Sequence, residues 1–162
     1  MRLTLFLLTL GLLLVTQFNS PLRASDPHLD DERACGDEAP FALHQYRWKK
    51  RVLVVSAPDA DDPKRLEQLA ALVSTSDEFA DRDMVLVTLL DNADSMADGC
   101  KLTSAEVAAA RTDLGILPSS FVLKLIGKDG SVKLTASSTV SMEEIYGLID
   151  TMPMRQREMF EG

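Results

Sequence analysis

The sequence predicts a single α/β domain with a central mixed sheet of about four strands flanked by helices. Two short runs, residues 52–56 and 83–90, have the apolar and β-branched composition of strands that are covered on both faces. A helical pattern follows each of these runs along the chain. With 162 residues, the chain can build one hydrophobic core but not two.

Residues 1–24 have the layout of a secretory signal peptide. Arg2 precedes an almost unbroken apolar run from Leu3 to Val15, and Ala24 is a suitable last residue before cleavage. The apolar run is shorter than the ~20 residues of a membrane-spanning helix. We therefore expect an exported protein, periplasmic or secreted, with no membrane span after cleavage. The alternative interpretation is an N-terminal anchor that is not cleaved.

The charge of the chain excludes several classes of partner. The formal net charge is −8 at pH 7, and loss of residues 1–24 leaves 15 basic against 25 acidic residues, a net charge of −10. Nucleic acids and anionic lipid surfaces would repel such a protein, because they bind basic patches. We therefore predict no nucleic-acid partner. The high net charge also favours a soluble monomer.

The first half of the chain gives one helix between two strands. The polar and acidic segment 25–45 predicts a poorly ordered lead-in, which ends where the strand at 52–56 approaches. Asp62 is a capping residue, and Pro63 occupies the first helical position of a helix with an apolar stripe ending at Val73. The strand at 83–90 follows, and then a polar loop over 91–101.

A second helix and a third strand come next. Thr103 and Glu106 form a capping box, which predicts a helix that begins there, and Gly115 ends it. Pro118 then leads into an apolar strand over residues 121–126.

The last part predicts a hairpin and a helix. Gly130 supplies a tight turn, so residues 132–135 return beside the third strand. Ser141 begins a helix that Pro153 ends. The resulting order is β-α-β-α-β-β-α, in which two crossover units supply parallel strands and a hairpin adds an antiparallel edge. This is the arrangement of the thioredoxin-like fold.

The segment between the first strand and its helix has the position of a thioredoxin active-site turn without its chemistry. A thioredoxin or peroxiredoxin nucleophile is a cysteine at the start of that helix, where the helix dipole lowers the thiol pKa. Ala60 and Pro63 occupy the corresponding positions here. We therefore predict no catalytic residue and no cofactor.

A non-catalytic module that binds an unknown protein partner is the leading functional hypothesis. Pro118 stands before a strand, where thioredoxins keep a cis-proline, and its isomer is left open. The predicted binding surface consists of the degenerate turn and this proline: Pro58, Asp59, Ala60, Asp61, Asp62 and Pro118.

Two alternatives use other residues. Cys35 and Cys100 form an even pair in an exported chain, which indicates a structural disulfide, and a redox protein would use the same pair reversibly. A weaker alternative is a divalent-metal module at Asp59, Asp61 and Asp62, because carboxylate oxygens are ligands for Ca²⁺. Helix capping and a solvated turn explain these carboxylates without a metal.

Three segments, residues 48–58, 125–134 and 149–159, resemble a known family. They are similar to the thioredoxin-like domain of unknown function (DUF) family 4174, which occurs in exported bacterial proteins and in vertebrate secreted matrix proteins. The similarity covers a domain over residues 46–159 and leaves 160–162 as a tail. It implies the fold and export, but it implies no reaction.

The most specific part of the resemblance is the run M-P-M-R-Q-R-E near the C-terminus. Methionine adapts to varied partners, and arginine is enriched at interfaces. Met154, Arg155 and Arg157 are therefore a candidate docking tail. The alternative is that this run folds back against the sheet edge beside the last helix.

Overall fold

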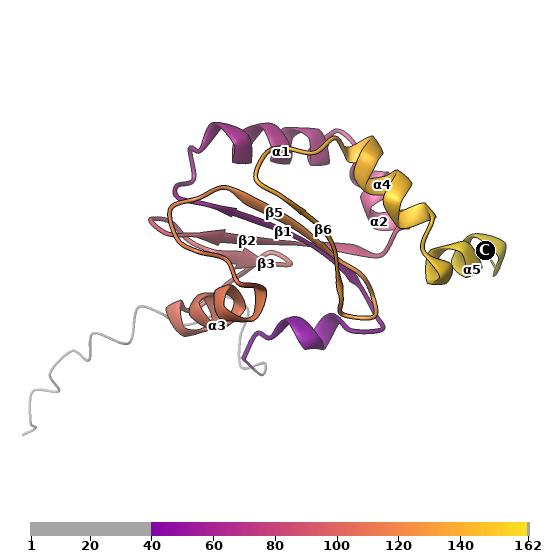
Figure 1. Ribbon diagram of the computed structural model, residues 1–162, viewed down its shortest axis with the longest axis horizontal. Helices are drawn as coiled ribbons and strands as arrows, with labels where there is room; N and C mark the ends of the chain where they lie inside the picture. The colour runs from indigo at the N-terminus through magenta and orange to yellow at the C-terminus, as the bar shows by residue number, and fades with distance from the viewer. Residues whose placement is uncertain (1–39, 162) are drawn as a thin grey trace, which may run out of the picture.

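The structure is a computed structural model that describes residues 40–161 (Figure 1). The predicted signal peptide, most of the lead-in and Cys35 lie outside the described residues. The elements in chain order are η1 (Leu43–Tyr46), β1 (Arg51–Ala57), α1 (Pro63–Val73), α2 (Ser76–Asp81), β2 (Met84–Leu90), β3 (Met96–Ala97), β4 (Cys100–Lys101), α3 (Ser104–Leu114), β5 (Val122–Ile126), β6 (Val132–Ala136), α4 (Met142–Asp150) and α5 (Pro153–Glu161).

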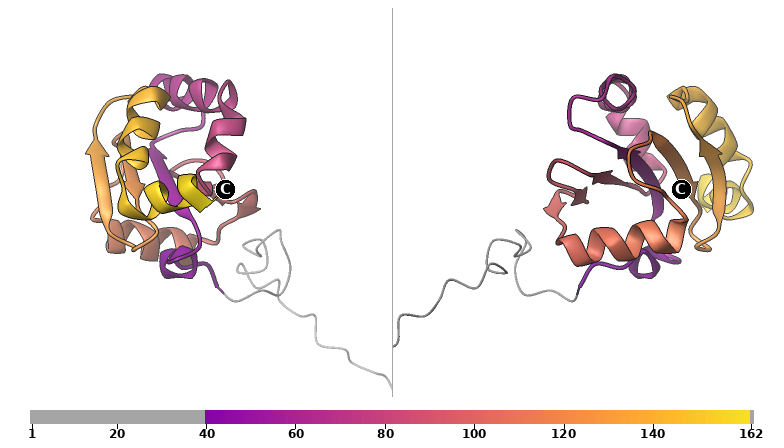
Figure 2. Two further views of the ribbon diagram at one scale, coloured as in Figure 1. Left: turned by 90° about the vertical axis from the view of Figure 1, so that its right-hand side faces the viewer. Right: turned by 60° about the vertical axis from the view of Figure 1, so that its left-hand side comes forward.

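The described strands form one mixed sheet with the order β4-β3-β2-β1-β5-β6. Helices α1, α2 and α4 cover one face, and α3 with η1 covers the other (Figures 1 and 2). Because side chains alternate along a strand, β1 supplies both cores. Leu53 and Val55 pack with Ile145 on the α4 face, whereas Val54 packs with Ala110 on the α3 face. The predicted α/β class is confirmed.

The direction of β5 differs from the prediction. β1 pairs in parallel with β2 but antiparallel with β5, so one of the two expected parallel crossovers is absent. The reason is that the segment between β2 and β5 begins and ends at the same edge of the sheet. The Ser119 N–H donates to Asp91 Oδ2 at 2.6 Å, which joins the residue after β2 to the approach to β5.

The structure also contains short elements that the sequence patterns did not predict. β3 and β4 are two-residue strands within the loop predicted over 91–101, which extends the sheet beyond the expected four strands. A short helix, α2, follows α1. Pro153 lies beyond the end of α4 and begins α5, because proline is well suited to the first position of a helix.

The helix starts predicted at Asp62, Thr103 and Ser141 and the helix end predicted at Gly115 are confirmed. The Asp62 side chain accepts a hydrogen bond from Arg65 N at 3.0 Å, Thr103 and Glu106 form a capping box, and Gly115 is left-handed with φ of 61°. Phe41, within the predicted lead-in, is buried, and its N–H donates to Glu106. Within residues 40–161, no helix has the length and apolar character needed to cross a membrane.

A buried glutamine joins the first helix to the segment before the last long one. Gln68 on α1 is 1% exposed, and its amide bonds both backbone groups of Val140. Nε2 donates to Val140 O at 3.0 Å, and Val140 N donates to Oε1 at 2.9 Å. The side chain of Gln68 therefore supplies the hydrogen bonds that the backbone N–H and C=O of Val140 do not receive from a helix or strand.

We predict that Gln68→Met lowers the free energy of unfolding by about 2 kcal/mol, because it leaves two buried backbone groups without partners. The matched control is Gln156→Met, at an exposed position of α5, which should change stability by less than about 0.5 kcal/mol. Urea denaturation at neutral pH measures both values. Equal effects of the two variants would contradict this role for Gln68.

Candidate functional site

The degenerate turn lies at the carboxyl ends of β1 and β2, and the loop after β2 holds it in place. Pro58 O accepts hydrogen bonds from Asp91 N at 3.2 Å and Asn92 N at 3.1 Å. Asn92 Nδ2 donates to Asp59 Oδ1 at 2.8 Å. Within the turn, Arg65 NH1 donates to Ala60 O at 2.6 Å. The turn is therefore fixed at both ends by hydrogen bonds.

An ion pair connects this region to α3. Arg111 NH2 lies 2.7 Å from Asp91 Oδ1, and the arginine side chain is only 11% exposed. The same NH2 donates to Leu89 O at 3.2 Å. Because Asp91 also accepts from Ser119 N, one carboxylate joins β2, α3 and the segment before β5.

A groove of about 480 Å³ lies beside this ion pair, between the loop after β2, α3 and Pro118. Pro118 lines the groove, and no peptide bond within residues 40–161 is cis, so its preceding bond is trans. The turn residues 58–62 do not line the groove, but Asp59 contacts its rim through Asn92. The lining residues are Leu90, Asp91, Asn92, Ala93, Asp94, Ser95, Lys101, Leu102, Ser104, Val107, Ala108, Arg111, Pro118 and Ser119.

The three turn carboxylates are not arranged as a metal site. Asp62 caps α1, Asp59 accepts from Asn92, and Asp61 is exposed. Among residues 40–161, no group of three or more His, Cys, Asp or Glu residues is placed to hold a metal ion. The weaker metal hypothesis therefore has no geometric support in this part of the chain.

Cys100 lies on β4, at the edge of the sheet, away from the turn at the end of β1. Its predicted pairing with Cys35 stays a prediction, because Cys35 lies outside the described residues.

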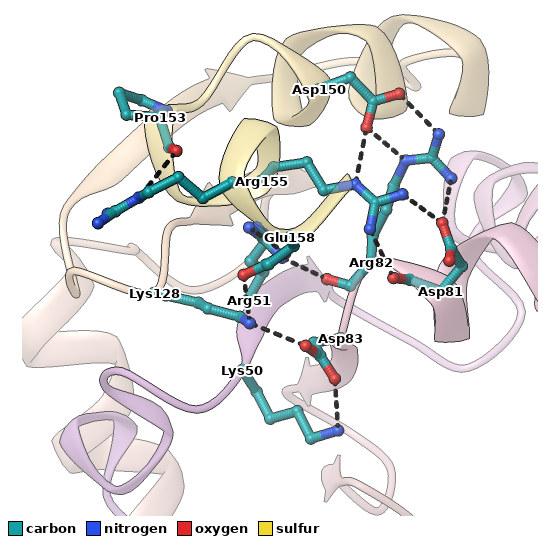
Figure 3. A network of polar contacts seen from close by, with 11 residues as sticks. Lys50, Arg51, Asp81, Arg82, Asp83, Lys128, Asp150, Pro153, Arg155 and Glu158 are labelled. Atoms are coloured by element: carbon teal, nitrogen blue, oxygen red, sulfur yellow. Dashed lines mark hydrogen bonds and ion pairs between the residues drawn. The ribbon is translucent and has the colours of Figure 1, made fainter. Parts of the chain in front are cut away.

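The run M-P-M-R-Q-R-E forms most of α5, and its first arginine points into the molecule (Figure 3). Arg155 is 7% exposed. Its guanidinium donates to the side chain of Asp81, to Asp81 O at 2.9 Å and to Asp150 Oδ1 at 3.2 Å. Arg82 donates to the other oxygen of Asp150 at 2.7 Å. Intramolecular contacts therefore occupy Arg155, whereas Arg157 is exposed.

A second group of charges joins α5 to the amino end of β1 (Figure 3). Glu158 accepts from Arg51 NH2 at 3.0 Å and from Lys128 Nζ at 2.6 Å. Lys128 also donates to Asp83 at 2.8 Å, and Lys50 donates to the same aspartate at 3.3 Å. These charges, with those around Arg155, form what we call the α5 network.

The network lowers the pKa values of three of its carboxyls, those of Glu158, Asp150 and Asp83. For Glu158, burial acts to raise the pKa, but hydrogen bonds from Lys128 and Arg51 outweigh it, so the pKa is lowered. For Asp150, burial likewise acts to raise the pKa, but hydrogen bonds and charge interactions with Arg82 and Arg155 outweigh it, so the pKa is lowered. For Asp83, the hydrogen bond from Lys128 is the largest cause of a lowered pKa. All three therefore favour the charged form in the folded protein.

Sequence reasoning missed Asp91 and Arg111 at the groove. Arg111 follows a run of three alanines in α3, and a long cationic side chain that is buried there requires a partner. This pattern indicates that Arg111 forms an ion pair, but it does not show which carboxylate is the partner. The partner is 20 positions earlier in the sequence, after another strand, and only the folded chain brings the two together.

The fold and this site define a thioredoxin-like protein in which the active-site turn carries no thiol. Its structure is similar to the reduced 2-Cys peroxiredoxin of Plasmodium vivax, with a TM-score of 0.53, 20% identity and coverage of 71% of this chain and 84% of that one. It is also similar to thioredoxin peroxidase I of Plasmodium yoelii, with a TM-score of 0.51, 19% identity and coverage of 71% and 79%. At these identities the likeness shows the fold alone.

The chain belongs to the family described as "Domain of unknown function (DUF4174)", which matches residues 42–158. This range agrees with the resemblance found over residues 46–159. A curated relative, coiled-coil domain-containing protein 80 of Danio rerio, is 30% identical over 166 aligned positions. The alignment covers 90% of this chain but 19% of the relative, so this chain corresponds to about a fifth of that protein's length.

We predict that Glu158→Gln lowers the free energy of unfolding at pH 7 by about 1–2 kcal/mol, because buried Arg51 and Lys128 lose their shared carboxylate. The folded-state pKa of Glu158 lies below its unfolded value, so its contribution is present above the unfolded pKa and is lost as pH falls. The difference between wild type and variant should therefore shrink from about pH 5 toward pH 3.

Glu161→Gln is the matched control for this measurement. Glu161 is exposed near the end of the same helix and belongs to none of the ion pairs found among residues 40–161. Urea denaturation across the pH range should show little effect of this change. A stability difference for Glu158→Gln that did not change with pH would count against the charge-based account.

Proposed function

We propose that this protein is an exported, monomeric, non-catalytic module that binds a protein partner. The contact surface is the groove beside Pro118 together with the turn 58–62 and Leu117, which we call the strand-end surface. The observation that carries the proposal is the groove of about 480 Å³, located at the carboxyl ends of β1 and β2. In α/β folds this is where ligands bind, and the turn here lacks a thiol.

The chemistry of the strand-end surface supports a protein partner. Leu117 is 75% exposed beside the groove, which gives an apolar side chain for a partner to bury. Arg111 and the loop carboxylates supply a polar border, and the Asp91–Arg111 ion pair holds the walls in place without a partner. A surface that is already ordered loses little entropy on binding.

The cysteines have a structural role in this proposal. A Cys35–Cys100 disulfide would close a loop of about 65 residues and limit the unfolded state, with a stabilisation of about 4 kcal/mol in the chain-entropy model. The competing proposal, a reversible redox pair, makes function depend on both thiols. The two proposals therefore differ in what happens when both cysteines are replaced.

We predict that a photo-crosslinking amino acid at position 117 captures a discrete protein partner when the full chain is produced in its native host. The control places the same amino acid at position 73 on α1, because Val73 is 71% exposed and remote from the groove. The product should form at 117 and not at 73, and electrophoresis with mass spectrometry identifies it.

The double variant Cys35→Ser/Cys100→Ser decides between binding and redox chemistry. The binding module should form the same crosslinked product, with a lower melting temperature as the only cost. Loss of the product in a double variant that remains folded would favour the redox protein. Equal capture at positions 117 and 73 would remove the strand-end surface as the binding site.

A further inference from the structure

A second cavity, of about 280 Å³, lies at the opposite end of β1. Three segments that are distant in the sequence build it: the approach to β1, the β5–β6 turn and the junction between α4 and α5. Of its lining residues, Figure 3 labels Lys128 and Arg51, which point toward Glu158, and Pro153 at the start of α5. The lining residues are Trp48, Arg51, Gly127, Lys128, Asp129, Lys133, Met152, Pro153, Met154 and Arg157.

Trp48 forms an exposed aromatic wall of this cavity and has an unusual backbone. Its φ is +66°, in the left-handed region that bulky residues rarely adopt. The Trp48 N–H donates to Lys128 O at 2.6 Å, which holds the backbone there, while the residue remains 61% exposed. Residues in such strained conformations persist only where the surrounding structure holds them, and they cluster at ligand-binding sites.

The remaining apolar surface comes from the chain around the start of α5. Met152, Pro153 and Met154 line the cavity beside Trp48. Methionine side chains adapt their shape to a ligand, and they contact aromatic rings favourably. The cavity therefore offers one flat wall and one adaptable wall to an apolar group.

Among the residues that line the cavity, the ion pairs within residues 40–161 leave one cation available, and the guanidinium of Arg47 lies 5.1 Å from the centroid of the Trp48 ring. Arg51 and Lys128 are paired with Glu158, and Lys133 is paired with Asp129 at 2.8 Å. Arg157 has no ion pair within residues 40–161, and its one hydrogen bond there runs from Nε to Pro153 O at 3.4 Å. Its terminal nitrogens can therefore bind an anion in the two-bonded geometry that suits a carboxylate.

Two further features favour an anion at this place. The cavity lies at the amino end of α5, where the helix dipole is positive. Arg51 lines the cavity and is 1% exposed, and within residues 40–161 its buried Nε has no hydrogen-bond partner. The positive charge beside the cavity is therefore incompletely satisfied by the contacts of this part of the chain. In a chain of net charge −8, this is a local positive region.

We propose that this cavity binds a small organic monocarboxylate. The carboxylate pairs with Arg157 at the amino end of α5, and the apolar part lies between Trp48 and the methionines of the α4–α5 junction. The volume suits a molecule of about ten non-hydrogen atoms, near the lower limit of ligand sites. The net charge of the protein disfavours acidic macromolecules and polyanions, so one charge on a small apolar body fits best.

The chain provides its own reporter, because Trp48 is its only tryptophan. Titration of the full chain with sodium hexanoate should change the tryptophan emission saturably, with a Kd on the order of 1 mM. It should also raise the melting temperature, because a ligand that binds the folded state stabilises it. Hexanamide, which has the same chain without the charge, and sodium chloride at equal concentration should do neither.

Arg157→Gln should weaken hexanoate binding about tenfold, because it removes a charge-assisted pair, and Arg157→Lys should restore part of the affinity. Lys64→Gln removes a cation from α1, outside the cavity, and should leave the Kd unchanged. Arg157 is exposed, so its variants should keep the wild-type melting temperature without ligand.

Five outcomes would overturn the proposal. These are an equal response to hexanamide, undiminished binding by Arg157→Gln, and neither an emission change nor a melting shift with hexanoate. The fourth is an equal response to inorganic phosphate, which would mark a simple anion site. A peptide with a free C-terminal leucine that bound at least tenfold more tightly than hexanoate would also reassign the site to polypeptide ends.

Discussion

The pairing of β1 with strands on both sides is the constraint on which the rest of this structure depends. All seven residues of β1 are buried, and its two sets of alternating side chains supply the two cores. Its parallel contact with β2 aligns the ends of these two strands. The turn, the loop after β2 and the groove all lie at the carboxyl edge, and the α5 network with the second cavity lies at the amino edge.

The two edges are held by different kinds of interaction. At the carboxyl edge, backbone hydrogen bonds to Pro58 and one ion pair, Asp91–Arg111, fix loops that remain exposed to solvent. At the amino edge, α5 is attached by a group of partly buried charges whose centre is Glu158. Loops fixed in this way leave the strand-end surface exposed to solvent, whereas intramolecular contacts occupy Arg155, one of the three residues of the candidate docking tail.

The sequence predicted what depends on neighbours along the chain. Asp62 and the Thr103–Glu106 capping box predict helix starts, because each capping residue bonds a group only three residues further along the chain. It could not predict that β5 runs antiparallel to β1, because helical and strand periods carry no direction. The sequence likewise could not predict the ion pairs Asp91–Arg111 and Lys128–Glu158, since each joins segments that are separate along the chain. Pro153 was misassigned because proline suits both the end of one helix and the start of the next.

The position of β1 at the centre of the sheet has a consequence for synthesis. Val52 has Val85 as one neighbour and Ile126 as the other, so a chain emerging from the ribosome completes one side of β1 long before the second. Until then a largely apolar strand presents an unpaired edge, the kind of surface that templates aggregation. A nascent chain that paused between β2 and β5 would therefore expose this edge of β1 and be prone to aggregate.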